Sequence, residues 1–197
     1  VRQALSHLVP RQEIVDTVYA GEVTQAVMSG ISPLAIGYDT SLEPYSHNVT
    51  LAKQLLAQAG YNVESSDILF HITLLVAAGT EQGFAIVNMI KSSFESVGID
   101  TDVVVTHFDS SDADSIIGRL FPSSADDVGK TYDQGGFDAA WIIYEYRDYV
   151  SPYSYYHSSQ FPPEGENSNL WNNTESDRLC KLIAETENET ERLEYLK

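Results

Sequence analysis

The sequence is poor in cysteine and in positive charge, and both shortages exclude whole classes of protein. Its single cysteine, Cys180, allows no intramolecular disulfide and no zinc site built on two or four cysteines. Its 11 lysine and arginine residues stand against 29 aspartate and glutamate residues, which gives a net charge of −18. Such a chain repels phosphate, so nucleic-acid binding and attachment to an anionic membrane surface are disfavoured.

Long apolar runs and the short motifs of common catalytic sites are missing as well. The longest apolar run, 68–78, is shorter than the ~20 residues that cross a bilayer, and it contains His71. No G-x-S-x-G elbow marks a nucleophile, and Gly135-Gly136 precedes a strand pattern instead of opening a helix as a phosphate loop would. Apolar residues still make up 43% of the chain, so we expect a folded core.

Helical and strand patterns alternate along the chain. Apolar residues recur every three or four positions in the predicted helices, and β-branched runs mark the predicted strands. We expect helices at 1–7, 11–19, 49–59, 81–97, 109–120, 174–184 and 189–197, and strands at 68–76, 101–108 and 137–144. This order predicts an α/β fold with a mixed, mostly parallel sheet flanked by helices. Segment 21–47 has neither pattern and is predicted to be a long surface loop, and 145–171 to be irregular.

Several asparagines stand where helix caps are expected. Asn48, Asn173 and Asn188 each precede a helical pattern, and asparagine is a favoured N-cap residue. Asn48, Asn172 and Asn188 also begin N-x-T sequons, which are short enough to arise by chance. The two ends of the chain read as the inside of helices, with no cap before Val1 and no stop before Lys197, so we expect a fragment of a longer protein.

Aromatic residues are concentrated after the third predicted strand. Within sixteen positions the chain has Trp141, Tyr144, Tyr146, Tyr149, Tyr153, Tyr155 and Tyr156, with Glu145, Arg147 and Asp148 among them. In open α/β sheets ligands bind beyond the carboxyl ends of the strands, and tyrosine combines a rigid apolar face with one polar group. The cluster is therefore either a ligand- or partner-binding surface or a loop that packs its own rings over the sheet edge.

Metal-ligand patterns are weak. His107 and His157 are fifty residues apart with no third ligand evident, and we expect both to be ordinary polar histidines. The acidic run 109–114 lacks the glycine and the terminal glutamate of an EF-hand loop. His71 lies inside an apolar strand and is expected to be a hydrogen-bonded core residue. The sequence therefore predicts no metal site.

Several segments match the sequence patterns of one known family. VRQALSHLVPRQEIVDTVYAG resembles R-x-A-L-x-x-A-I-D-R-x-x-I, although Val9-Pro10 departs from the usual Ile-Asp. NVTLAKQLLAQAGY resembles D-P-x-K-A-K-x-L-L-x-E-A-G-Y, and TENETERLEYLK resembles T-D-x-x-x-R-x-x-x-Y. The segment at 136–138, G-F-D, is similar to the x-(D/F)-F-D that starts the strand leading to the ligand. These landmarks resemble the family 5 solute-binding proteins of ABC importers, the oligopeptide-, dipeptide- and nickel-binding group.

The resemblance implies one lobe of a two-lobed, periplasmic-binding-protein-like (type II) fold that closes on its ligand. Residues 1–197 would form a single lobe, most of the C-terminal lobe of a longer chain, with the N-terminal lobe as its missing partner. The implied function is non-enzymatic and needs no cofactor. The protein would bind an oligopeptide, a dipeptide or a similar cationic solute outside the cell membrane and deliver it to the membrane permease. Attachment through a lipid anchor is left open.

The resemblance also implies a ligand-binding segment. In peptide-binding members a W-x-x-D-Y-x-x-P segment packs its aromatic residue on the ligand, and its Asp receives the α-amino group. Tyr144 stands at the Trp and Asp148 at the Asp, with Arg147 as an apparent one-residue insertion. Because Arg147 can neutralise Asp148, Glu145 is the alternative carboxylate. The predicted ligand-binding residues are Tyr144, Glu145, Tyr146, Asp148 and Tyr149.

Three other functions stay open. A nickel or metal-chelate binder of the same family would turn His157 or His107 toward the cleft. A small α/β hydrolase domain would need the nucleophile motif that the chain lacks. A signalling or scaffold module that keeps the fold without transport would share every sequence feature above.

Overall fold

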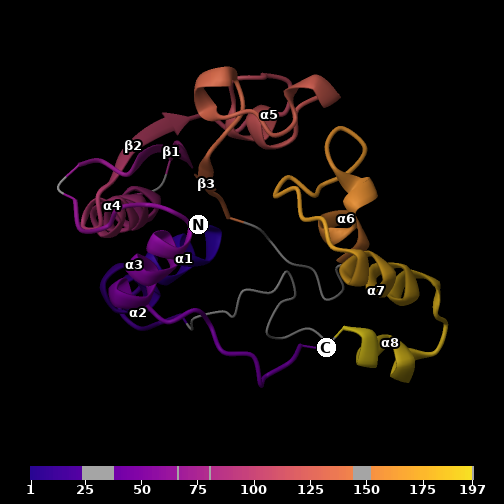
Figure 1. The fold of residues 1–197 in the computed structure, drawn as a ribbon. Helices are drawn as coiled ribbons and strands as arrows, with labels where there is room; N and C mark the ends of the chain where they lie inside the picture. Colours follow the sequence, from indigo (N-terminus) through magenta and orange to yellow (C-terminus); the bar gives the residue numbers. More distant parts are fainter. Residues whose placement is uncertain (24–37, 66, 80, 144–151, 197) are drawn as a thin grey trace. The chain divides into compact units, whose positions relative to one another are not determined.

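The computed structural model describes residues 1–23, 38–65, 67–79, 81–143 and 152–196 (Figure 1). Two compact units divide the chain. The first unit comprises Val1–Gln25, Pro44–Phe108 and Phe137–Ile142, and the second comprises Ala26–Glu43, Asp109–Gly136 and Ile143–Lys197. The prediction that 1–197 forms a single lobe stays a prediction.

The helices of the first unit begin and end within two residues of the predicted positions. They are α1 (Arg2–Leu8), α2 (Arg11–Val18), α3 (Val49–Gln58) and α4 (Glu81–Glu95). Pro10 separates α1 from α2 because its ring removes a backbone donor and disfavours helical geometry at the preceding residue. Asn48 caps α3 as predicted, since its side-chain oxygen accepts a hydrogen bond from the Leu51 amide at 2.9 Å.

Replacing the cap of α3 gives a small, local prediction. Asn48→Ala leaves the Leu51 amide without its side-chain acceptor, so we expect the free energy of unfolding to fall by about 1 kcal/mol. Urea unfolding measures the loss. Asn62→Ala is the control, because Asn62 is exposed and lies in a turn outside the helices. An equal loss in both variants would contradict the capping role.

Among the described residues of the first unit, three strands form a parallel sheet in the order β2-β1-β3. β1 (Phe70–Ala77) pairs with β2 (Ile99–Thr106) along its whole length and with β3 (Ala139–Trp141) only from Leu74 to Val76. Between β1 and β2 the chain crosses over through α4, as a parallel pair requires (Figure 1). The predicted α/β class, with helices beside a mostly parallel sheet, is confirmed.

The third strand is shorter than the predicted 137–144. Before β3 begins, the Asp138 carboxylate accepts a hydrogen bond from the Thr73 backbone amide at 2.9 Å. The Asp138 side chain therefore occupies the Thr73 amide, which a backbone carbonyl of a longer β3 would otherwise accept from. Backbone pairing between β1 and β3 starts only at Ala139.

The core of the first unit lies between the sheet and its helices. Ile72, Leu74 and Val76 alternate along β1 and point to the face that packs on these helices, as the two-residue period of a strand requires. Thr73 and Leu75 on the other face are buried as well. The buried side chains that pack with them include Ala4, Leu8, Ala52, Leu56, Ile86, Val87, Ile90 and Phe94 from α1, α3 and α4.

His71 does not belong to this core, so that expectation is wrong. Its side chain is 40% exposed, and its Nδ1 lies 2.9 Å from the Asp100 carboxylate. The physical reason is its position one residue into β1, on the face opposite Ile72, where two β2 carboxylates provide a polar environment.

The second unit is built from short elements. They are α5 (Ile116–Leu120), α6 (Pro152–Tyr156), α7 (Thr174–Glu185) and α8 (Glu189–Tyr195), with 3₁₀ turns at Ala125–Asp127, Tyr132–Gln134 and Ser158–Gln160. The predicted helix 109–120 is confined to α5. Ser115 caps α5 through the Gly118 amide at 2.9 Å, and the preceding carboxylates of Asp109 and Asp112 accept hydrogen bonds from backbone amides two residues on.

Arg119 holds the loop that follows α5. Its Nη1 donates to the carbonyl oxygens of Tyr132 and Gly136 at 3.1 and 3.0 Å, and its Nη2 lies 2.9 Å from an Asp114 oxygen. The guanidinium also lies 4.4 Å from the centre of the Tyr132 ring. One largely buried side chain thus fixes the loop that leads into β3.

The segment predicted to be irregular, 145–171, contains α6 and a 3₁₀ turn within its described part. Asp177 of α7 joins the turn to the helix, because its two carboxylate oxygens accept from the backbone amide and the hydroxyl of Ser158 at 2.8 and 2.5 Å. These hydrogen bonds lower the pKa of the Asp177 carboxyl. The helices predicted at 174–184 and 189–197 are confirmed as α7 and α8, each capped by asparagine.

Candidate functional site

The carboxyl edge of the sheet is the position where an open α/β sheet binds ligands. β1 ends at Ala77, β2 at Thr106 and β3 at Trp141, and the register pairs Ala77 with Thr106 and Val76 with Trp141. All three strands therefore end on one edge of the first unit. Along the chain, Ile142 and Ile143 follow β3 and lead directly to the predicted ligand segment.

The predicted ligand-binding residues Tyr144, Glu145, Tyr146, Asp148 and Tyr149 lie outside the described residues. Their role stays a prediction. Of the other aromatic residues, Trp141 is partly buried and packs against the core of the first unit. Tyr153 stacks on His157, with ring centres 4.4 Å apart, and its hydroxyl lies 3.3 Å from the Ser159 hydroxyl. Tyr153 thus fits the alternative in which the loop packs its own rings.

An exposed aromatic residue marks the carboxyl end of β2, and sequence reasoning missed it. Phe108 is 66% exposed, and Val105 before it is 48% exposed. A large apolar side chain left in water at the ligand edge of a sheet is available for contact with a bound molecule. The sequence pattern had placed Phe108 inside a strand predicted at 101–108. The observed β2 ends at Thr106, so Phe108 lies two residues beyond the strand.

The histidines do not gather into a metal centre. His157 is 5% exposed, and its Nδ1 accepts a hydrogen bond from the Ser159 amide at 3.0 Å. His107 is exposed just beyond β2. In the part of the chain that the structure describes, no group of three histidine, cysteine or carboxylate side chains is placed to hold a metal ion.

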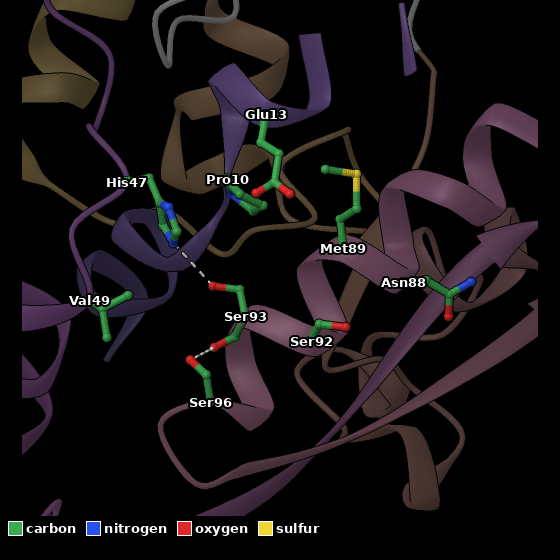
Figure 2. Close-up of a pocket in the computed structure, with 9 residues that line it drawn as sticks. All are labelled: Pro10, Glu13, His47, Val49, Asn88, Met89, Ser92, Ser93 and Ser96. Atoms are coloured by element: carbon green, nitrogen blue, oxygen red, sulfur yellow. Dashed lines mark hydrogen bonds between the residues drawn. The ribbon is translucent and has the colours of Figure 1, made fainter. Parts of the chain in front are cut away.

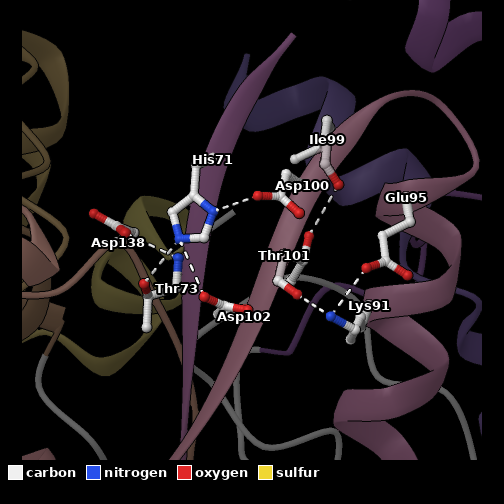
Figure 3. Close-up of polar contacts among 9 residues, drawn as sticks. All are labelled: His71, Thr73, Lys91, Glu95, Ile99, Asp100, Thr101, Asp102 and Asp138. Atoms are coloured by element: carbon white, nitrogen blue, oxygen red, sulfur yellow. Dashed lines mark hydrogen bonds and ion pairs between the residues drawn. The ribbon is translucent and has the colours of Figure 1, made fainter. Parts of the chain in front are cut away.

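A polar cluster surrounds His71 at the opposite, amino-terminal end of the strands (Figure 3). Its Nδ1 contacts Asp100 at 2.9 Å, and its Nε2 lies 3.8 Å from Asp102 and 3.4 Å from the Thr73 hydroxyl. On the other face of β2, Lys91 pairs with Glu95 at 2.9 Å and donates to the Thr101 carbonyl. These contacts join β1, β2 and α4, so their role is structural.

A cavity of about 430 Å³ lies within the first unit beside α2 and α4 (Figure 2). Its polar groups are largely engaged with the protein itself. Ser93 donates to the Leu8 carbonyl at 2.5 Å and lies 3.3 Å from His47, and Ser96 donates to the Ser93 carbonyl at 2.6 Å. Its lining residues are Pro10, Glu13, His47, Val49, Asn88, Met89, Ser92, Ser93 and Ser96, and none of them belongs to the predicted ligand segment.

Known structures share this fold over nearly the whole chain. The oligopeptide-binding protein AppA from Bacillus subtilis, solved with a nonapeptide, aligns with a TM-score of 0.81 and 24% identity, covering 98% of this chain and 37% of that chain. NikZ from Campylobacter jejuni, solved with Ni(L-His), aligns with a TM-score of 0.76 and 18% identity, covering 100% of this chain and 37% of that chain. The fold is therefore that of part of a periplasmic binding protein.

The sequence identifies the family. Residues 1–167 match the family described as "Bacterial extracellular solute-binding proteins, family 5 Middle", so the chain belongs to this family. Among curated relatives, AppA from Bacillus subtilis is 26% identical over 190 residues, which cover 92% of this chain and 32% of AppA. Heme-binding protein A from Haemophilus influenzae is 31% identical over 105 residues, covering 53% of this chain and 19% of that protein. The chain thus spans about a third of AppA, and the resemblance found in the sequence is confirmed. None of the described helices is long and apolar enough to cross a membrane.

Proposed function

We propose that the full-length protein is the substrate-binding component of an ABC importer and works outside the cell membrane. It binds a peptide or a similar cationic solute and passes it to the membrane permease, without chemical change to the solute. The observation that carries this proposal is the parallel sheet of this chain, which belongs to family 5. Its three parallel strands end on one edge, and the last of them leads straight into the acidic, tyrosine-rich segment.

The sequence of that segment favours a positively charged ligand. Tyr144, Tyr146 and Tyr149 supply aromatic faces, which attract cations. Asp148, or Glu145 in its place, supplies a carboxylate, and a carboxylate taken out of water beside aromatic rings needs a cation as partner. The net charge of −18 adds a long-range attraction for cations. A peptide satisfies these requirements through its α-ammonium group.

The direct test is to identify what the protein carries. Full-length protein is purified under native conditions and denatured, and the released molecules are identified by mass spectrometry. Peptides of mixed sequence are the expected result. If nickel or a metal chelate is released instead, the ligand is a metal complex and the peptide assignment is wrong. An empty protein whose melting temperature no peptide raises would contradict the importer function.

The exposed phenylalanine at the end of β2 provides a second test. Phe108→Ala removes apolar surface from the ligand edge, so we expect peptide binding to weaken roughly tenfold, which corresponds to about 1.4 kcal/mol of lost apolar contact. Calorimetric titration with a peptide recovered from the protein measures this change.

Ile68→Ala is the matched control for Phe108→Ala. Ile68 is also an apolar residue, 67% exposed, but it precedes β1 at the opposite end of the sheet. The control is expected to bind the peptide as the unmodified protein does. Equal affinities of both variants would show that Phe108 does not contact the ligand.

A further inference from the structure

The loop at 167–173, before α7, is held by the buried side chain of Asn167. Asn167 is 1% exposed, and its side chain forms two hydrogen bonds of 2.9 Å with Trp171, one with the backbone amide and one with the carbonyl. The same side chain donates to the His157 carbonyl at 3.2 Å. The backbone of Trp171 is therefore held in place by a buried amide, and the residue after it projects from a defined point.

The side chains of Trp171 and Asn172 in this loop are directed toward solvent. Trp171 is 46% exposed, and Asn172 next to it is exposed as well. Within the described ranges, no hydrogen bond engages the Asn172 side chain. Asn173 caps α7 through the amides of Glu175 and Ser176, both at 3.0 Å. The helix therefore does not need Asn172.

Asn172 also begins the sequon Asn172-Asn173-Thr174, and the other two sequons are placed differently. The side-chain nitrogen of Asn188, the atom to which a glycan is attached, donates to Glu191 at 3.2 Å. Asn48 uses its side-chain oxygen to cap α3, and the remaining two residues of its sequon lie in that helix. Of the three asparagines that begin sequons, Asn172 alone is both exposed and free of a capping role.

We propose that Asn172 is an N-glycosylation site, with the exposed Trp171 ring as the surface on which the first sugars pack. The site rests on the extracytoplasmic location proposed above, because an N-x-T acceptor belongs to an exported surface loop. The apolar C–H face of a sugar ring matches the face of an indole. A glycan at this position covers an apolar side chain and leaves the cap of α7 intact.

The reaction takes a lipid-phosphate-linked oligosaccharide as donor and a membrane oligosaccharyltransferase of the same cell as catalyst. Nδ2 of Asn172 forms a bond to the anomeric carbon of the sugar, and the bond from that carbon to the phosphate oxygen breaks. The lipid phosphate leaves, and one Nδ2 proton passes through the transferase to solvent. The product keeps the side-chain carbonyl of Asn172.

Glycopeptide mass spectrometry of the full-length protein, purified from the cells that make it, tests the site. The peptide that contains Asn172 is expected to carry a sugar mass, and the peptides that contain Asn48 and Asn188 are expected to be bare. Asn172→Gln and Thr174→Ala should both remove the modification. Thr174→Ser, which keeps the sequon, and Asn188→Gln should retain it.

The experiments distinguish a failure of the glycosylation proposal from a failure of the proposed location outside the membrane. Protease treatment of intact cells shows whether the protein is outside the membrane. If it is outside and Asn172 is bare, the glycosylation proposal is wrong and the location stands. If it is inside, both are wrong. A glycan on Asn48 or Asn188 in place of Asn172 would also overturn the proposal.

Discussion

Asp148→Ala is expected to leave the full-length protein without bound peptide. The α-ammonium group of the ligand would then lie beside tyrosine rings with no opposite charge. Removing one partner of a desolvated charge pair costs about 2–5 kcal/mol, so we expect peptide affinity to fall on the order of 100-fold or more. Calorimetric titration with a recovered peptide gives the affinity, and mass spectrometry of the denatured variant gives the remaining cargo.

Chemical modification of the ligand makes this test specific for the amine. An N-acetylated copy of the same peptide has no α-ammonium charge, so it should bind the unmodified protein weakly. Asp148→Ala should bind the acetylated and the free peptide alike. Glu145→Ala is the control and should keep the preference for the free amine. If Glu145→Ala loses this preference and Asp148→Ala keeps it, Glu145 is the anchor and the assignment of Asp148 is wrong.

Gly136→Ala is expected to destabilise the fold strongly, and more than alanine at the neighbouring Gly135. A Cβ at this position would lie 2.0 Å from the Lys130 carbonyl oxygen and 2.6 Å from its carbon, so the backbone must move. The same glycine donates its amide to Thr131 at 2.9 Å and accepts from Arg119 at 3.0 Å. Forced displacement strains both hydrogen bonds, and we expect a loss of about 3 kcal/mol or more in unfolding free energy.

Gly135→Ala provides a control one residue away. No atom lies within 4 Å of a Cβ at Gly135, but its φ of +94° is unfavourable for alanine, so the expected loss is only about 1 kcal/mol. Thermal melting and hydrogen exchange of the peptides covering 115–136 compare the two variants. Equal destabilisation would show that the loop moves freely enough to accept the extra carbon at Gly136.

The elements that the sequence predicted best are those defined by local chemistry. The helices α3, α7 and α8 follow asparagine caps, and α4 follows an apolar repeat that needs no distant partner to be recognised. The parallel sheet also followed from the order of patterns. These features depend on neighbours within a few residues, where periodicity and capping carry the information.

The errors arose where distant residues decide the structure. β3 begins later than predicted because the Asp138 carboxylate takes a backbone donor of β1, which lies 65 positions away in the chain. His71 is exposed because it stands near the start of β1, and two carboxylates of β2 lie beside it there. Phe108 was assigned to a strand, because the residue pattern does not show that its ring is left in water. The ligand residues themselves were inferred from family resemblance and remain predictions.

The order of residues in the core of the first unit bears on how the protein is made. Every fully packed member of that core lies between Ala4 and Ile99, while β3, from Ala139 to Trp141, only adds an edge strand to β1. A chain that emerges from its amino end can therefore close this core before β3 and the tyrosine-rich segment have been synthesised. The binding segment is then added to a platform that already exists, so substitutions within it should reduce ligand binding without lowering the yield of folded protein.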